Sequence, residues 1–132
     1  MTTELTLLAW TLLLALVQIF LPAIARTRQY GTAWNAGPRD AAMPPGGQLT
    51  GRLERAQRNL FETLPLFIAA VLIADQAGRT GPMTALGAQL YFWCRVVYLP
   101  LYAFGVPYVR SLVWMASLVG LLLIVFTILR PA

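Results

Sequence analysis

Apolar residues group into four long stretches, separated by short segments rich in charge, glycine and proline. The first, 5–25, is an uncharged run of 21 residues. At about 1.5 Å per residue it is long enough to cross a hydrocarbon layer of about 30 Å. The pattern predicts an all-α membrane protein, a four-transmembrane-helix bundle, with helices at about 4–27, 50–76, 82–104 and 107–130.

The second stretch is too short to span a membrane by itself. Residues 60–74 supply only 15 mostly apolar positions, which is roughly 22 Å of helix. The helix must therefore begin near residue 50 and carry several polar residues into the membrane boundary. Pro65 cannot donate a hydrogen bond to the carbonyl of Phe61, so a kink is expected there. The glycines and prolines of 29–49 predict a loop on the cytoplasmic side.

The composition fits a single membrane domain covering 1–132. Hydrophobic residues make up 58% of the chain and charged residues 11%, against about 25% charged in soluble domains. There is no histidine and only one cysteine, Cys94. Zinc, haem and histidine acid/base chemistry therefore lose their usual ligands, and no metal is expected. The arginines lie at membrane boundaries, so a nucleic-acid partner is not expected either.

The distribution of arginine predicts the orientation in the membrane. All ten basic residues are arginine. Six lie in 26–58 and one in 105–110, on one side of the predicted bundle, while only Arg79 and Arg130 lie on the other. Cytoplasmic loops carry the excess of basic residues, so both termini are expected on the non-cytoplasmic side.

Polar residues of the last three helices are expected at one membrane level, near the cytoplasmic surface. On the second helix they occur at i, i+3, i+4 and i+7, which is one helical face. The third helix repeats this spacing with an arginine and two tyrosines, and the fourth begins with an Arg-Ser pair. The candidate site residues from this argument are Arg55, Arg58, Asn59, Glu62, Arg95, Tyr98, Tyr102, Arg110 and Ser111.

A charge at membrane depth costs roughly 2.5–3.5 kcal/mol, so these residues indicate a built polar site. Glu62 requires a cation, either Arg58 one turn earlier or an arginine of a neighbouring helix. One alternative is purely structural, an interhelical clamp of Glu62 with Arg58 and Arg95. The surplus of arginine over acid favours instead an anion with two or more carboxylates. Glutathione has these groups, and composition does not distinguish it from a lipid headgroup.

The motifs resemble a known family. The stretch Arg55-Ala56-Gln57-Arg58-Asn59-Leu60-Phe61-Glu62 resembles the R-x-x-R-N-x-x-E signature of the MAPEG family, membrane-associated proteins in eicosanoid and glutathione metabolism. Arg95-Val96-Val97, the tyrosine at 102 and Arg110-Ser111 are similar to the third and fourth helices of that family. The chain is more similar to its bacterial branch than to the eicosanoid enzymes.

The resemblance implies a homotrimer of four-helix bundles that binds glutathione at each subunit interface, near the cytoplasmic face. One subunit would supply residues 58, 59 and 62, and its neighbour the polar residues of the third and fourth helices. Arg110 would stabilise the glutathione thiolate, and Arg28 or Arg26 would be the first-helix arginine near the ligand. The implied binding residues are Arg28, Arg55, Arg58, Asn59, Glu62, Arg95, Tyr98, Tyr102 and Ser111.

Two departures from the prostaglandin-forming relatives argue against eicosanoid isomerase chemistry. Trp114 stands where they have a tyrosine one turn after the Arg-Ser pair, and Tyr98 stands where they have a histidine. The expected function is a membrane-embedded glutathione-dependent transferase or peroxidase of the bacterial inner membrane. Its substrates would be lipophilic electrophiles or lipid hydroperoxides dissolved in the bilayer.

Two other functions remain open from the sequence. The first is a non-catalytic membrane scaffold that binds an anionic lipid headgroup in the arginine pocket. The second is a small-molecule exporter in which Glu62 carries the coupled proton, although Arg58 one turn away disfavours a freely titrating carboxylate.

Overall fold

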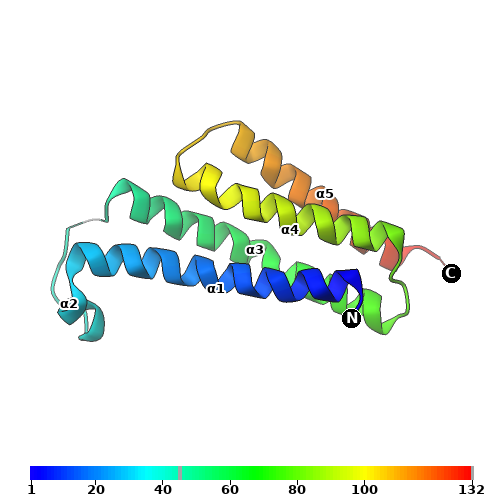
Figure 1. The fold of residues 1–132 in the computed structure, drawn as a ribbon, viewed down its shortest axis with the longest axis horizontal. Coiled ribbons are helices and arrows are strands. Elements are labelled where there is room, and N and C mark those ends of the chain that lie inside the picture. Colours follow the sequence, from blue (N-terminus) through cyan, green and yellow to red (C-terminus); the bar gives the residue numbers. More distant parts are fainter. Residues whose placement is uncertain (45, 132) are drawn as a thin grey trace.

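The computed structural model describes residues 1–44 and 46–131. Within these ranges the chain is helical, with no strand. The helices are α1 (Thr3–Tyr30), α2 (Thr32–Ala36), α3 (Gln48–Gln76), α4 (Pro82–Ala103) and α5 (Val109–Leu129). The four long helices lie side by side, with α4 packed along α5 and α1 along α3 (Figure 1). The expectation of an all-helical chain is confirmed.

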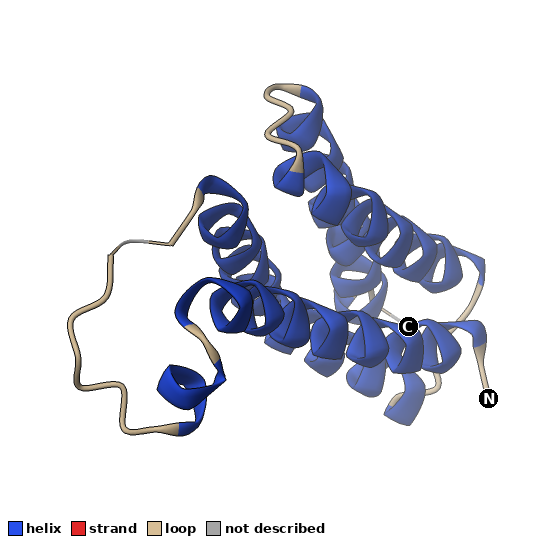
Figure 2. Cartoon of the chain, turned by 60° about the vertical axis from the view of Figure 1, so that its left-hand side comes forward, coloured by secondary structure: helices blue, strands red, loops and turns tan. Residues whose placement is uncertain are grey.

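The connections divide the bundle into two ends. Figure 1 shows both termini and the turn between α3 and α4 at one end of the bundle. The other end, called here the loop end, holds α2 and the connection between α4 and α5. The long segment that joins α1 to α3 through α2 extends beyond the bundle at the loop end (Figure 2). The polar stretches of α3, α4 and α5 are therefore brought to the same end of the molecule.

Helix boundaries differ from the expectation at two places. The segment expected as a loop over 29–49 contains α2, because Gly31 (φ 94°) ends α1 with an N–H bonded to the Thr27 carbonyl and a new helix starts at once. At the other connection α5 begins at Val109, two residues after Pro107. Tyr108 takes a positive φ of 56° there, so the chain turns before the helix starts. α3 continues through Pro65 to its end.

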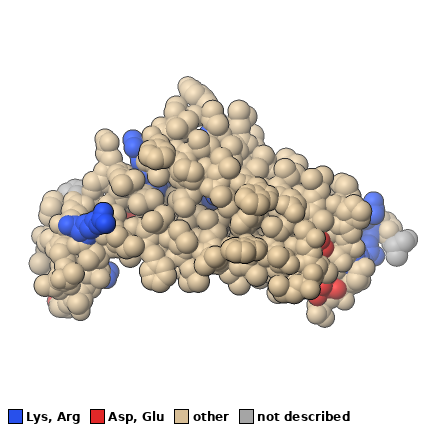
Figure 3. All heavy atoms as spheres, viewed as in Figure 1, with Lys and Arg blue, Asp and Glu red and all other residues tan. Residues whose placement is uncertain are grey.

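Within the described ranges, three helices are long and apolar enough to cross a membrane: α1, α3 and α5. Many of their apolar side chains are exposed on the single chain, such as Phe20, Leu66 and Phe126. On the face shown in Figure 3 the charged residues lie mainly toward the two ends of the molecule, and the band between them is largely uncharged and carries exposed apolar side chains. Such a band is stable only in contact with lipid or with another protein surface, as in an integral membrane protein.

The core lies where α3 meets α4. Leu60, Phe67 and Val71 of α3 are fully buried, as is Tyr91 of α4. The rings of Phe67 and Tyr91 stack with their centroids 4.1 Å apart. The hydroxyl groups of Thr63 and Tyr91 form a hydrogen bond of 2.8 Å, so the one polar atom of the tyrosine is paired inside the core. These contacts hold α4 at a fixed rotation against α3.

α4 and α5 approach each other most closely at a pair of glycines. A Cβ atom at Gly120 would lie 2.5 Å from the carbonyl oxygen of Gly87, and one at Gly87 would lie 2.4 Å from that of Gly120. Small residues allow membrane helices to pack backbone against backbone. This crossing sets the position of α5, and therefore of the polar residues at its start.

Candidate functional site

A polar cleft of about 290 Å³ opens near the loop end, between α3, α4 and α5. Four of its residues are aromatic or amide side chains and two form the Arg-Ser pair at the start of α5. The lining residues are Asn59, Tyr98, Tyr102, Arg110, Ser111 and Trp114. Five of these six are among the candidate site residues expected from the sequence, and the fold brings them together within one chain.

Arg95 lies behind the cleft and contacts two of the residues that line it, Asn59 and Tyr98. Its side chain is 0% exposed. Its Nη1 donates a hydrogen bond of 2.7 Å to Oδ1 of Asn59, and its guanidinium lies 4.3 Å from the ring centroid of Tyr98. The Nε and Nη2 groups have no partner among the residues that the structure describes. Arg95 therefore connects α4 to α3 and contributes positive charge to the cleft from behind.

Tyr102 is held between two further arginines. Nε of Arg55 donates a hydrogen bond of 3.2 Å to the Tyr102 hydroxyl, and the guanidinium of Arg110 lies 4.5 Å from the centroid of its ring. The ring of Tyr98 packs edge-on against that of Tyr102, with centroids 5.6 Å apart. Cation–π contacts of this kind fix the arginines as well as the ring. Arg55, Arg95 and Arg110 thus surround a small region with positive charge.

Comparison with models of protein families identifies the family of this chain. The sequence model of the MAPEG family matches residues 7–130, nearly the whole chain. This chain belongs to the MAPEG family. The resemblance to this family, inferred from the α3 motif, is therefore confirmed. A search of curated proteins and a search of solved structures each returned no match. The family includes glutathione-dependent transferases and peroxidases.

The MAPEG signature on α3 is divided between two faces of the helix. Arg55 and Asn59 point toward α4, where they meet Tyr102 and Arg95. Arg58 and Glu62 are exposed on the single chain. Packing divides a face that helical spacing would keep together: the side with Arg55 and Asn59 turns toward α4, and Arg58, one residue before Asn59, is rotated from it by about 100°. Within the single chain Asn59 contacts Arg95 on its own α4, and the expectation that residues 58, 59 and 62 act from one subunit and α4 from another stays a prediction.

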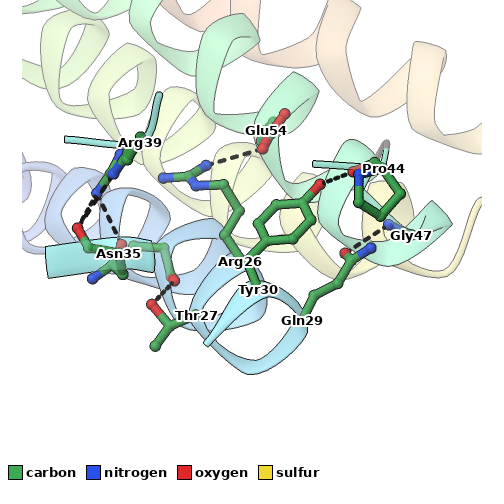
Figure 4. Close-up of polar contacts among 10 residues, drawn as sticks. Arg26, Thr27, Gln29, Tyr30, Asn35, Arg39, Pro44, Gly47 and Glu54 are labelled. Carbon is green, nitrogen blue, oxygen red and sulfur yellow. Dashed lines mark hydrogen bonds and ion pairs between the residues drawn. The ribbon is translucent and has the colours of Figure 1, made fainter. Parts of the chain in front are cut away.

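The acidic residues of α3 also pair differently from the expectation. In the described part of the chain Glu62 forms no ion pair with Arg58 or with any other arginine within 4 Å, although its charge acts on Arg95 and Tyr98 at longer range. The i, i+4 spacing would pair Glu54 with Arg58, but these two residues form no ion pair in the structure. Glu54 instead accepts a hydrogen bond of 3.0 Å from Nη1 of Arg26 (Figure 4), because it faces α1. This ion pair joins α1 to α3 at the loop end.

Arg28 does not join the polar cleft. It is exposed near the end of α1 and lines a different cleft, between α1 and α3. Of the candidate residues, the single chain therefore assembles Arg55, Asn59, Arg95, Tyr98, Tyr102, Arg110 and Ser111, and it leaves Arg28, Arg58 and Glu62 outside.

Trp114 is a residue of the cleft that was not among the candidate site residues. Its i, i+4 spacing from Arg110 predicts that the two share a face of the last helix. Its Nε1 is buried and has no partner in the described part of the chain.

Arg52 was also missed as a neighbour of the site. Its Nη1 lies 3.5 Å from the Ala103 carbonyl oxygen, and its guanidinium packs under Gly105. It thereby fixes the α4–α5 connection that precedes Arg110.

We expect the Asn59→Ala variant to be less stable than the wild type by roughly 1.5–3 kcal/mol, the usual value of a hydrogen bond to a charged group. The loss arises because Arg95 keeps its charge in a fully buried position without Asn59, its one hydrogen-bond acceptor among the described residues. Thermal unfolding of the purified protein measures it. Asn35→Ala, in α2, is the matched control: it removes an acceptor from the exposed Arg39 and should change stability little. Equal stabilities for the two variants would show that Arg95 does not depend on Asn59.

Proposed function

We propose that this protein is a microsomal-type glutathione transferase or peroxidase of a bacterial inner membrane, with glutathione bound in the polar cleft. The observation that carries the proposal is the convergence of Arg55, Arg95 and Arg110 around Tyr98 and Tyr102. With Arg58 and Glu62 supplied together by a neighbouring copy, four guanidinium groups would face one carboxylate and leave a surplus of positive charge. Glutathione with an ionised thiol carries two negative charges overall, so it would offset most of that surplus.

The chemistry of the lining residues supports a tripeptide ligand. Arginine forks bind carboxylates through two parallel hydrogen bonds. Tyrosine and serine hydroxyls and the Asn59 amide are able to donate to peptide carbonyls and accept from peptide N–H groups. The cleft volume of about 290 Å³ lies at the lower end of the roughly 300–1,000 Å³ usual for small-molecule sites. The ligand would therefore be partly exposed in a single chain and covered by a second one.

The exposed charges of α3 support an assembly of several copies. Arg58 and Glu62 lie beside apolar side chains that are also exposed, such as Phe61 and Leu66. Each charge would cost roughly 2.5–3.5 kcal/mol against lipid. A homotrimer, as the family resemblance implies, would cover this face and bring Arg58 and Glu62 to the polar cleft of a neighbouring copy. The site would then contain both halves of the α3 signature.

The proposal includes a fourth membrane crossing. α4 has 22 residues, about 33 Å of helix, and packs along both α3 and α5 in the same bundle. Arg95 lowers the mean hydropathy of α4, but its guanidinium is buried against other residues of the protein and does not face lipid. With four crossings the arginine-rich loop end lies in the cytoplasm and both termini lie outside.

The proposed reactions need no nucleophile from the protein. A free thiol has a pKa of about 8.5, and a neighbouring guanidinium such as that of Arg110 favours the thiolate. In the transferase reaction the thiolate sulfur forms a bond to an electrophilic carbon, and the leaving group departs with its electron pair. In the peroxidase reaction two glutathione molecules are oxidised to the disulfide, while the hydroperoxide is reduced to an alcohol and water. Lipophilic substrates would reach the cleft from the bilayer, between helices.

We expect glutathione to stabilise the detergent-solubilised protein against heat. A ligand at about 100 times its dissociation constant adds about 2.7 kcal/mol to the stability of the state that binds it. The gain should shrink in Glu62→Gln, which removes the charge proposed to reach the ligand, and should persist in Asp40→Asn, an exposed loop acid. No gain in the wild type would contradict the proposal. A gain from phosphatidylglycerol that disappears in Arg110→Ala would assign the cleft to a lipid headgroup instead.

A further inference from the structure

A second cleft lies between the end of α1 and the start of α3, and it shares no residue with the polar cleft. It has a volume of about 440 Å³. Its rim is polar, with Arg28, Gln29 and Thr50. Its floor is apolar, with Leu21, Ile24 and Leu53 among the lining residues. Arg28 follows Leu21 by seven residues, or about 10 Å along the helix, so polarity decreases from the loop end toward the middle of the bundle.

The rim is fixed by contacts rather than formed by loose side chains. Oε1 of Gln29 accepts a hydrogen bond of 3.0 Å from the backbone N–H of Gly47, and the Tyr30 hydroxyl donates to the carbonyl oxygen of Pro44 (Figure 4). These contacts hold the end of the α1–α3 connection against α1. The ion pair of Arg26 with Glu54 joins the same two helices on the adjacent side (Figure 4). The cleft is therefore a built feature of the loop end.

Two groups at the rim lack partners within the described chain. Arg28 makes no ion pair or hydrogen bond there, in contrast to Arg26 two residues earlier. Thr50 is 5% exposed and lines the cleft, and its hydroxyl makes no hydrogen bond to the described residues. A free cation and an unpaired hydroxyl beside an apolar floor match a ligand with an anionic, hydrogen-bonding head and a hydrocarbon tail.

We propose that this cleft binds one anionic phospholipid. The phosphate would lie against Arg28 with Thr50 beside it, and an acyl chain would follow Leu21 and Ile24. The charge of Arg28 favours a phospholipid over a neutral lipophile, and the apolar lining by Leu21, Ile24 and Leu53 favours it over a free anion. The site is separate from the polar cleft and does not depend on the proposed glutathione chemistry.

The test is the dissociation constant of single lipids on the full-length protein in detergent, measured by native mass spectrometry. Dioleoylphosphatidylglycerol should bind more tightly than dioleoylphosphatidylcholine. Arg28→Gln should weaken phosphatidylglycerol roughly fivefold, the effect of one basic residue at an anionic membrane surface. Arg39→Gln makes the same change of charge at an exposed loop position and should have little effect. Arg28→Lys should retain most of the affinity.

Two results would overturn the proposal. Equal affinities for the two lipids, or an equal effect of Arg28→Gln and Arg39→Gln, would show that the cleft does not select an anionic head. Glycerol phosphate that competes as strongly as the whole lipid would show that the apolar floor takes no part. All of these measurements are made without glutathione, so their outcome is independent of the polar cleft.

Discussion

Turnover in the Arg110→Ala variant is expected to fall by about 100- to 1,000-fold, the usual loss when one preorganised group that stabilises a developing anion is removed. Arg110 lies at the start of α5, lines the polar cleft and is held 4.5 Å from the ring centroid of Tyr102. Its guanidinium is the cation proposed to stabilise the glutathione thiolate. The rate is measured with saturating glutathione, so that the loss appears in kcat rather than in binding.

Two controls accompany this variant. Arg110→Lys keeps the charge without the planar fork and should retain part of the activity. Arg130→Ala removes an exposed arginine at the opposite end of the molecule and should leave kcat unchanged. A loss confined to KM for glutathione would mean that Arg110 binds the peptide but does not act on its sulfur, and the assigned role would then be wrong.

Gly120→Ala should lower the free energy of unfolding by about 1–3 kcal/mol or more, the cost of overpacking a close contact. The added Cβ would lie 2.5 Å from the Gly87 carbonyl oxygen and 2.8 Å from the backbone nitrogen of Tyr91. Backbone atoms cannot rotate out of the way as a side chain would, so α5 must move from α4. Because Arg110 is on α5 and Tyr102 on α4, the cleft should lose its geometry as well.

Thermal unfolding in detergent, with and without glutathione, measures both effects. Gly47→Ala is the matched control, since a Cβ there meets nothing within 4 Å and its φ of −61° suits any residue. A Gly120→Ala protein as stable as Gly47→Ala would show that the two helices are not held in backbone contact, and the placement of Arg110 would need revision.

Much of the fold followed from the sequence because membrane helices have a strong local signal. Runs of apolar residues, arginines at their ends and glycine or proline between them identify the order of the long helices. The α2 helix was missed because five residues are too few for a period to stand out. The α3 motif was enough to identify the family, which the match over 7–130 confirms.

Partners of the charged residues were harder to predict, because they depend on the rotation of each helix. The i, i+4 rule suggests Glu54 with Arg58, yet Glu54 faces α1 and meets Arg26. Helical spacing alone places the α3 signature on one face, but packing divides it between α4 and the exposed surface. Nothing in the spacing of Arg95 shows that it is completely buried, with Asn59 as its one hydrogen-bond acceptor among the described residues.

The central claim is that Arg110 stabilises the thiolate of bound glutathione, and a pH titration of the thiolate absorbance tests it most directly. Glutathione is titrated with the wild-type protein in excess, with Arg110→Ala, and alone. The account predicts an apparent thiol pKa on the wild-type protein clearly below the value of about 8.5 for a free thiol, and a return toward that value in Arg110→Ala. A pKa that is the same with and without the wild-type protein, under conditions where glutathione is bound, would contradict it.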